Sequence, residues 1–216
     1  ALKGKPVLHL DATLRPELAK TIFPALSAEN VEVMAPHMRV RHVHGSFGKS
    51  MLCPSAGLAD DEAQRRKNRL SECVDYVRWH ARRVAPGRVL VVTYKAIEDA
   101  FAGIENVNVA HFNAVAGLDC YKDVALLISI GRPLPPSTEL EALAGTVFGH
   151  VPEGSYRRMR TGITMRSGIS RSIEVLSHEN VKAETLRAAI CDDELVQVVG
   201  RGRGVGRGEG NPLEVH

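Results

Sequence analysis

The sequence predicts an α/β domain built on a mostly parallel β-sheet with helices packed against it. Two segments carry this prediction: the apolar, β-branched run of residues 88–93 (RVLVVT) and the long helical pattern of residues 60–84. A strand that is apolar throughout is typical of a parallel sheet that is covered on both faces. The alternation of strand and helix patterns along the chain indicates βαβ units.

The composition is that of an ordinary globular protein, with 44% hydrophobic residues, 25% charged residues and a formal net charge of +3. No apolar run reaches the roughly 20 residues that a membrane-spanning helix needs, and the N-terminus has no signal-peptide layout. The cysteines are widely spaced, which argues against a zinc site or a disulfide framework: they are Cys53, Cys73, Cys120 and Cys191. We therefore expect a cytoplasmic protein with no membrane partner.

The N-terminal part of the chain is expected to contain short strands and one helix. The pattern predicts strands over residues 6–10, 31–34 and 38–44, a helix over 16–26 and a loop over 45–59.

The clearest helix is predicted over residues 60–84. Acidic residues fill its first turn and arginines its last, as the helix dipole favours. Its apolar residues recur at helical spacing and predict a buried face. Trp79 falls on the opposite side, so we expect it to be exposed or packed against a neighbouring domain. Pro86 and Gly87 end the helix.

Further elements are expected beyond this helix. They are a short helix over 96–101, strands over 107–112 and 123–130, an antiparallel strand pair over 156–164 and 171–177 around Gly168, and a helix over 178–199 capped by Asn180.

The antiparallel pair is basic. Between Glu153 and Glu174 there are five arginines and no carboxylate: Arg157, Arg158, Arg160, Arg166 and Arg171. Their guanidinium groups either bind phosphates along a nucleic acid or protect a solvated sheet edge by charge.

A glycine- and arginine-rich run follows the last helix, at residues 197–207 (QVVGRGRGVGR). Arginine binds two phosphate oxygens at once and stays charged at any working pH. Neighbouring glycines let the backbone approach a nucleotide closely. The alternative is a disordered arginine–glycine tail that binds RNA weakly.

Other segments are not assigned to the binding of a nucleotide or a metal. Residues 45–50 (GSFGKS) lack the first glycine of a phosphate-binding loop, because Val43 stands at that position, so we interpret them as a turn. The acidic run 192–194 lies within a helical pattern and is interpreted as surface or dipole charge. His37, His42 and His44 are interpreted as surface or packed histidines.

Residues 197–207 resemble motif VI, Q-x-x-G-R-x-x-R, of the XPD/DinG-like branch of superfamily 2 helicases. Three upstream segments are similar to other motifs of that branch, in the same order. They are residues 7–14 (VLHLDATL) for motif III, 89–94 (VLVVTY) for motif IV, and 117–119 (GLD), with the strand that ends in GRPLP at 131–135, for motif V. The resemblance spans about residues 6–207.

The sequence departs from the family pattern at three positions. Asp11 stands in place of the motif III serine, and Ala116 in place of the glutamate that precedes Gly117. Gly204 occupies the position of the second motif VI arginine, so either Arg203 or Arg207 takes that role.

The resemblance implies a RecA-like fold over residues 15–210, with the end of a preceding RecA-like domain at 1–14 and a tail at 211–216. In such motors ATP and Mg²⁺ are bound mainly by the preceding domain, and the second domain supplies arginines that neutralise charge on the γ-phosphate. Its partners are that preceding domain and DNA or RNA.

The resemblance also implies roles for individual residues of this chain. Arg201 and Arg203 would be catalytic arginines, Asp11 and Thr13 would link the two domains, and nucleotide contact or coupling would fall to Gln197, Gly200, Gly117 and Asp119. Two other functions stay open: a catalytically inactive RecA-like module that binds nucleic acid, and a phosphotransferase that uses residues 45–50.

Overall fold

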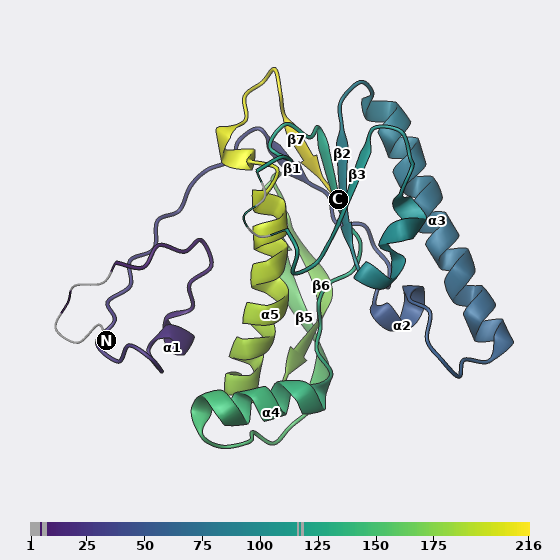
Figure 1. The fold of residues 1–216 in the computed structure, drawn as a ribbon. Helices are drawn as coiled ribbons and strands as arrows, with labels where there is room; N and C mark the ends of the chain where they lie inside the picture. The colour runs from purple at the N-terminus through teal and green to yellow at the C-terminus, as the bar shows by residue number, and fades with distance from the viewer. Residues whose placement is uncertain (1–4, 6–7, 116, 118) are drawn as a thin grey trace. The chain divides into compact units, whose positions relative to one another are not determined.

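The computed structural model describes residues 5, 8–115, 117 and 119–216 (Figure 1). The chain divides into two compact units. The first comprises Ala1–Glu29 and Leu134–Asp193, and the second comprises Asn30–Pro133 and Glu194–His216. The expected domain boundary between residues 14 and 15 stays a prediction.

The second unit contains a five-stranded sheet in which all strands are parallel. Its strand order is β1 (Met38–Val40), β7 (Leu213–Val215), β4 (Leu126–Ser129), β2 (Val89–Thr93) and β3 (Val107–His111). The helix α3 (Asp60–Val84) and the 3-10 helix η1 (Lys95–Phe101) contact this sheet, and the short α2 (Lys49–Leu52) contacts α3. The predicted α/β class, with a mostly parallel sheet flanked by helices, is confirmed.

The core of the second unit lies around β2, which is buried along its whole length. Val77 of α3, Phe101 of η1 and Val198 of α5 (Val181–Gly200) belong to the same apolar cluster. Full burial of such a side chain contributes about 1.5–3 kcal/mol. Trp79, on the other side of α3, is 60% exposed. Within this chain Trp79 is therefore exposed, and its packing against a neighbouring domain stays a prediction.

The first unit contains α1 (Pro16–Ala19), α4 (Ser137–Phe148), a β-hairpin and the residues of α5 up to Asp193. Its small apolar core consists of residues from α4 and α5, namely Leu140, Ala144, Ala183 and Leu186. Asn180 caps α5 as expected, because its Oδ1 accepts a hydrogen bond from the backbone N–H of Lys182 at 3.0 Å.

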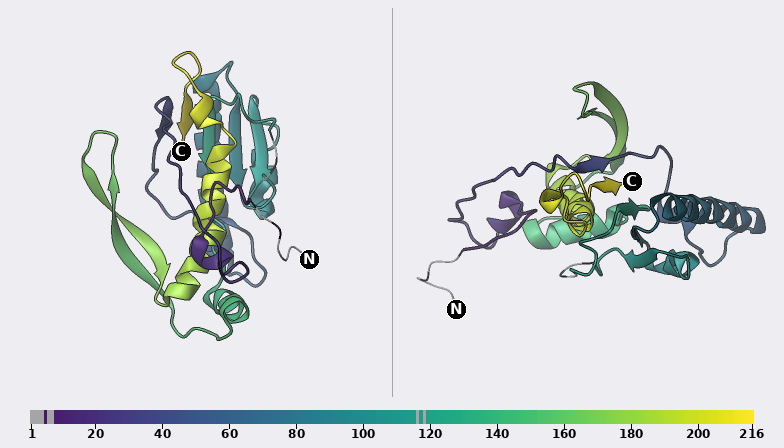
Figure 2. Two further views of the ribbon diagram at one scale, coloured as in Figure 1. Left: turned by 90° about the vertical axis from the view of Figure 1, so that its left-hand side faces the viewer. Right: turned by 90° about the horizontal axis from the view of Figure 1, so that it is seen from above.

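The hairpin consists of β5 (Tyr156–Thr164) and β6 (Ser170–His178), paired antiparallel (Figure 2). The predicted basic strand pair is confirmed, with the second strand one residue longer at each end. At its base, the Tyr156 hydroxyl donates to the carbonyl of Pro135 at 2.9 Å. The buried imidazole of His178 lies 3.3 Å from the carboxylate of Glu141. These contacts fix the base of the hairpin to α4 and the segment before it.

Several predictions for the N-terminal part were wrong. Residues 8–10 form no strand, and Leu8 and Leu10 are 82% and 84% exposed; residues 6 and 7 of that predicted strand lie outside the described residues. Residues 31–34 also form no strand. The predicted helix over 16–26 is only the four residues of α1, and the predicted strand over 38–44 is only β1. The apolar side chains of residues 8–10 and 31–34 are instead exposed, because neither segment pairs with a sheet within the described chain.

Four elements of the described chain were not predicted: α2 within the expected loop over 45–59, α4, the 3-10 helix η2 (Gly204–Gly206), and β7. None of the helices in the described part of the chain is long and apolar enough to span a membrane.

Candidate functional site

The segment of residues 200–207, here called the arginine segment, makes a compact turn at the end of α5. The backbone N–H groups of Arg201, Gly202 and Arg203 donate to carbonyls three residues earlier. A Cβ at Gly202 would overlap Leu213, and a Cβ at Gly204 would overlap Met38. Glycine at these positions therefore lets the segment pass directly over β7 and β1. The alternative of a disordered arginine–glycine tail is therefore not what the structure contains.

Arg203 binds Asp119, which lies in the loop between β3 and β4. Its Nε donates to Asp119 Oδ1 at 3.1 Å, and its Nη2 donates to the same oxygen. The hydrogen bonds from Arg203 hold the pKa of Asp119 below its ordinary value. Arg203 adopts a left-handed backbone conformation with φ 52°, which costs a non-glycine residue about 1 kcal/mol or more. The contact brings together two residues that the sequence placed at one site.

Arg201 directly follows α5 and lies beside Gln197, which is in the last turn of that helix. The guanidinium Nη2 of Arg201 donates to Gln197 Oε1 at 3.2 Å. Gly200 is the last residue of the helix. Gly117 has a φ of 75°, which favours glycine. Ala116 and Leu118, which flank it, lie outside the described residues.

Arg207 has a different environment from Arg203. Its side chain is buried, and its guanidinium donates to four backbone carbonyls, those of Gly202 at 2.8 Å, Asn211 at 3.3 Å, Lys122 at 2.6 Å and Val124 at 2.8 Å. Burial lowers the pKa of Arg207. This arginine joins the β3–β4 loop to the arginine segment, so of the two candidates for the second motif VI arginine, Arg203 is the one that can reach a ligand.

Asp11 and Thr13 interact with each other. The carboxylate of Asp11 accepts hydrogen bonds from the backbone N–H of Thr13 at 2.8 Å and from its hydroxyl at 3.0 Å. The two residues form a local turn in the first unit, directly after the segment 6–10 over which a strand was predicted.

The five arginines of the hairpin are exposed. Arg157 and Arg158 have side chains that are 72% and 82% exposed. Arg160 lies further along β5, Arg166 in the turn and Arg171 near the start of β6.

The acidic run within α5 is engaged by arginines. Asp192 accepts two hydrogen bonds from the buried Arg187, at 2.9 and 2.5 Å. Asp193 accepts two from Arg15, at 2.6 and 2.7 Å. Among the described residues there is no group of three or more side chains that could hold a metal ion. These carboxylates stabilise the first unit, in agreement with their interpretation as structural charge.

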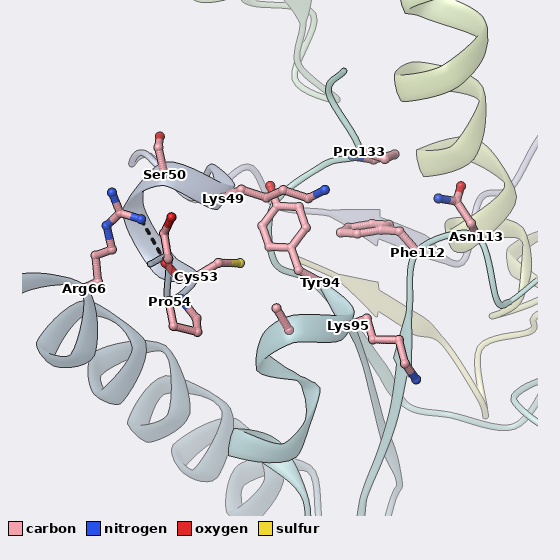
Figure 3. Close-up of a pocket in the computed structure, with 12 residues that line it drawn as sticks. Lys49, Ser50, Cys53, Pro54, Arg66, Tyr94, Lys95, Phe112, Asn113 and Pro133 are labelled. Carbon is pink, nitrogen blue, oxygen red and sulfur yellow. Dashed lines mark hydrogen bonds between the residues drawn. The ribbon is translucent and has the colours of Figure 1, made fainter. Parts of the chain in front are cut away.

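A groove of about 740 Å³ lies at the carboxyl ends of β2, β3 and β4 (Figure 3). Tyr94 follows β2, Phe112 follows β3 and Pro133 follows β4, while Lys49 comes from α2. The amine of Lys49 lies 5.8 Å from the centre of the Tyr94 ring. Lys95 and Arg66 also line the groove, where Lys95 forms an ion pair with Glu98 and Arg66 forms one with Glu62, and the described lining itself includes no carboxylate. The groove is therefore suited to an anionic ligand.

Tyr94 fixes the loop that follows β4. Its hydroxyl lies 3.0 Å from both the backbone N and the backbone O of Arg132. Gly131 has a φ of 89°, and a Cβ there would overlap the Tyr94 ring. The close packing of a tyrosine on a glycine therefore shapes one side of the groove.

The sequence interpretation missed this groove, although a signal was present. Tyr94 and Asn113 directly follow predicted strands and Phe112 is the last residue of one, and ligands of open parallel α/β sheets bind outside the carboxyl ends of the strands. Lys49 and Ser50 belong to the GSFGKS segment. Gly48 starts a helix of only four residues after an irregular segment, so the strand–loop–long helix context of a phosphate-binding loop is absent from this described region.

Comparisons with protein-family models, with curated proteins and with solved structures found no match for this chain.

Proposed function

We propose that this chain is the second RecA-like half of an ATP-driven nucleic-acid helicase or translocase, and that Arg203 and Arg201 neutralise charge developing on the γ-phosphate. One observation carries this proposal. Arg203 of the motif VI-like segment binds Asp119 of the motif V-like segment, although 84 residues separate them. The two segments that resemble nucleotide-dependent motifs therefore share one surface.

The chemistry of the pair favours an exchange of partners. The side chains of Arg203 and Asp119 are 58% and 63% exposed. A guanidinium group binds phosphate oxygens with the same forked geometry that it uses for a carboxylate. Phosphate would thus replace Asp119 as the partner of Arg203, and the β3–β4 loop would lose this contact. In this way nucleotide binding would affect the rest of the unit. Gln197 would orient Arg201 for the same ligand.

ATP and Mg²⁺ would be held mainly by a preceding domain. The residues of this chain fit the phosphate, because Arg201 and Arg203 are cationic and flanked by glycines. They do not fit the metal, because Asp192 and Asp193 are already engaged by arginines.

The carboxyl-edge groove supports the nucleic-acid part of the proposal. Lys49, Lys95 and Arg66 supply positive charge along it. Phosphate contacts of this kind position a strand without reading its sequence. We assign the groove to the strand on which the motor moves.

The test is ATP hydrolysis by the full-length gene product that carries this chain. Arginine fingers contribute on the order of a thousandfold or more in rate. Because they act on transition-state charge, Arg203→Ala and Arg201→Ala should each lower kcat by about that factor and change the Kd for ATP by less than about threefold.

The control is Arg78→Ala, which removes an exposed arginine of α3 that pairs only with its helical neighbour Asp75 in the described structure. It should hydrolyse ATP at the wild-type rate. Hydrolysis by Arg203→Ala within about threefold of wild type would falsify the assignment of the arginine segment.

A further inference from the structure

The two faces of the β5–β6 hairpin differ in chemistry. Residues directly opposite each other in the register share a face, and successive residues alternate between faces. One face, here called the polar face, carries mostly arginines and hydroxyl groups with one carboxylate, namely Arg158, Arg160, Thr164, Ser170, Ser172 and Glu174, and it includes Leu176 and, at the base, Tyr156 and His178. The other, here called the apolar face, carries Met159, Thr161, Ile163, Ile173 and Val175, with Arg157 and Arg171 near its ends.

The apolar face holds the two strands together. Met159 lies opposite Val175, and Thr161 opposite Ile173. Cross-strand pairs of this kind contribute to the stability of a two-stranded sheet. Such a sheet is marginal in water when it stands alone. The polar face carries one exposed ion pair, in which Arg158 lies 3.5 Å from Glu174. Such exposed pairs contribute little to stability, so the arginines and the hydroxyl groups of this face need another explanation.

The polar face suits phosphate groups in particular. All cations of the hairpin are arginines and none is a lysine. Arginine and hydroxyl side chains are the usual donors to backbone phosphates of nucleic acids. Five arginines against the single carboxylate of Glu174 give the hairpin a strong positive charge.

The hairpin does not suit unpaired bases. Proteins that bind single strands stack the bases on aromatic side chains. Residues 157–177 include no phenylalanine, tyrosine, tryptophan or histidine. Tyr156, at the base, instead donates its hydroxyl to Pro135. The hairpin therefore has the means to bind a phosphate backbone but not to stack on exposed bases.

The dimensions of the hairpin fit a DNA groove. Each strand has nine residues, which span about 30 Å at roughly 3.3 Å per residue. One turn of B-form DNA is about 34 Å long, and its major groove, about 12 Å wide, admits a two-stranded β-ribbon. The major groove of an A-form RNA duplex is too narrow to be read by side chains.

We propose that the β5–β6 hairpin binds double-stranded DNA, with its polar face in the major groove and Arg158 and Arg160 on the phosphates. The proposed function places one nucleic-acid strand in the carboxyl-edge groove, and this proposal adds a DNA duplex as a second ligand, bound by the hairpin. Duplex binding does not depend on nucleotide, so it is tested in the absence of ATP and stands or falls separately from hydrolysis.

The experiment is a fluorescence anisotropy titration of the full chain with a mixed-sequence DNA duplex of about two helical turns. The corresponding single strand and an RNA duplex are titrated in parallel. The DNA duplex should bind at least about tenfold more tightly than either, a difference of about 1.4 kcal/mol. Equal or tighter binding of the single strand or of the RNA duplex overturns the proposal.

Two charge-matched variants test the face. Arg158→Gln with Arg160→Gln removes two arginines from the polar face, and Arg157→Gln with Arg171→Gln removes two from the apolar face. The first variant should weaken duplex binding by about tenfold or more and reduce the slope of log K against log salt by about 2. The second should weaken binding by less than about threefold. Equal losses from both variants overturn the assignment, because only net charge would then matter.

An anionic membrane offers the same charge and is the competing partner. Sedimentation with vesicles of phosphatidylserine provides that comparison. Vesicle binding that the polar-face variant abolishes, together with duplex binding that it leaves unchanged, overturns the proposal in favour of a lipid surface.

Discussion

Arg201, Arg203 and Arg207 lie close together in the sequence but in different environments. Arg207 is buried and donates hydrogen bonds to backbone carbonyls, and Arg203 forms an exposed ion pair with Asp119. Arg201 donates a hydrogen bond to the side chain of Gln197. The sequence pattern identified the arginines but left Arg203 and Arg207 open, because spacing alone does not reveal which guanidinium is enclosed by a loop. Two of the four carbonyls that enclose Arg207, those of Lys122 and Val124, come from residues more than 80 positions away in the sequence.

These environments predict different effects on stability. Arg207→Met removes the donor for four carbonyls, two of which belong to the β3–β4 loop. Unsatisfied buried carbonyls cost about 1–3 kcal/mol each where water cannot reach them, so we expect the free energy of unfolding to fall by about 3 kcal/mol. Chemical denaturation followed by circular dichroism measures this change.

Arg203→Met is the matched substitution in the same segment. Because its ion pair is exposed, we expect the denaturation midpoint to stay close to that of the wild type. A larger shift for Arg203→Met than for Arg207→Met would reverse the roles assigned to the two arginines.

At the scale of elements, the helices and strands that local interactions stabilise could be predicted from the sequence, and those that depend on distant partners could not. The bounds of α3 were predicted to the residue, because its charges, its apolar spacing and its terminal Pro86-Gly87 all act locally. β7 was missed, because three residues within a glycine-rich tail become a strand only by pairing with β1 and β4. Conversely, residues 31–34 have strand-like residues but no partner strand in the described chain.

The missed helix α4 was a failure of interpretation. Leu140, Ala144, Val147 and Phe148 recur at helical spacing and pack in the core of the first unit. The prolines before Ser137 also mark a helix start. For the site, the sequence pattern assigned Arg203 and Asp119 to the same site. It did not predict the groove, because the groove is formed by three strand ends that meet only in the folded sheet.

The packing of α3 on β7 predicts a dependence of stability on pH. Burial, and then the charge of His216, lower the pKa of His80 to about 4. The unfolded chain takes up a proton at His80 as the pH falls below 6.5, whereas the folded chain does so only near 4. His80 therefore lowers the free energy of unfolding across that interval, by at most about 1.4 kcal/mol per pH unit.

Glu214 extends the same trend to lower pH. Burial raises its pKa, but hydrogen bonds from Arg83 and His216 outweigh this effect and lower the pKa to about 2. The stability that Glu214 contributes is complete above 4.5 and is lost as the pH falls toward 2. The two residues thus act in the same direction over successive intervals.

Urea denaturation of His80→Gln at a series of pH values separates the two contributions. Glutamine can still accept the hydrogen bond that Arg83 donates to His80 at 3.1 Å. The variant should lose less stability than the wild type between pH 6.5 and 4.5, where the contribution of Glu214 to stability changes little with pH. Parallel curves for the two proteins over that interval would contradict the assignment.

At the scale of the whole chain, the proposed function predicts an inactive fragment. The described residues contain no phosphate-binding loop and no set of carboxylates for Mg²⁺. The isolated chain should therefore release no phosphate from ATP above background in the presence of Mg²⁺, and Lys49→Ala should release as little. A phosphate-release assay checks both.

Magnesium-dependent turnover that Lys49→Ala abolishes would support a phosphotransferase that uses residues 45–50. It would also remove the basis for a half-motor. The same assay thus decides between the two enzymatic functions that the sequence left open.

The position of β7 in the sheet constrains the order in which the second unit can fold. β1 pairs only with β7 in the described sheet, and Met38 meets Leu213 across that pair. During synthesis β2, β3 and β4 can pair as soon as they emerge, whereas β1 has to wait for a strand that is made much later. Contacts so distant in sequence form slowly. The apolar edge of β4 and the residues of β1 therefore stay open to other chains for most of translation, and this is the stage at which we expect the protein to depend on chaperones.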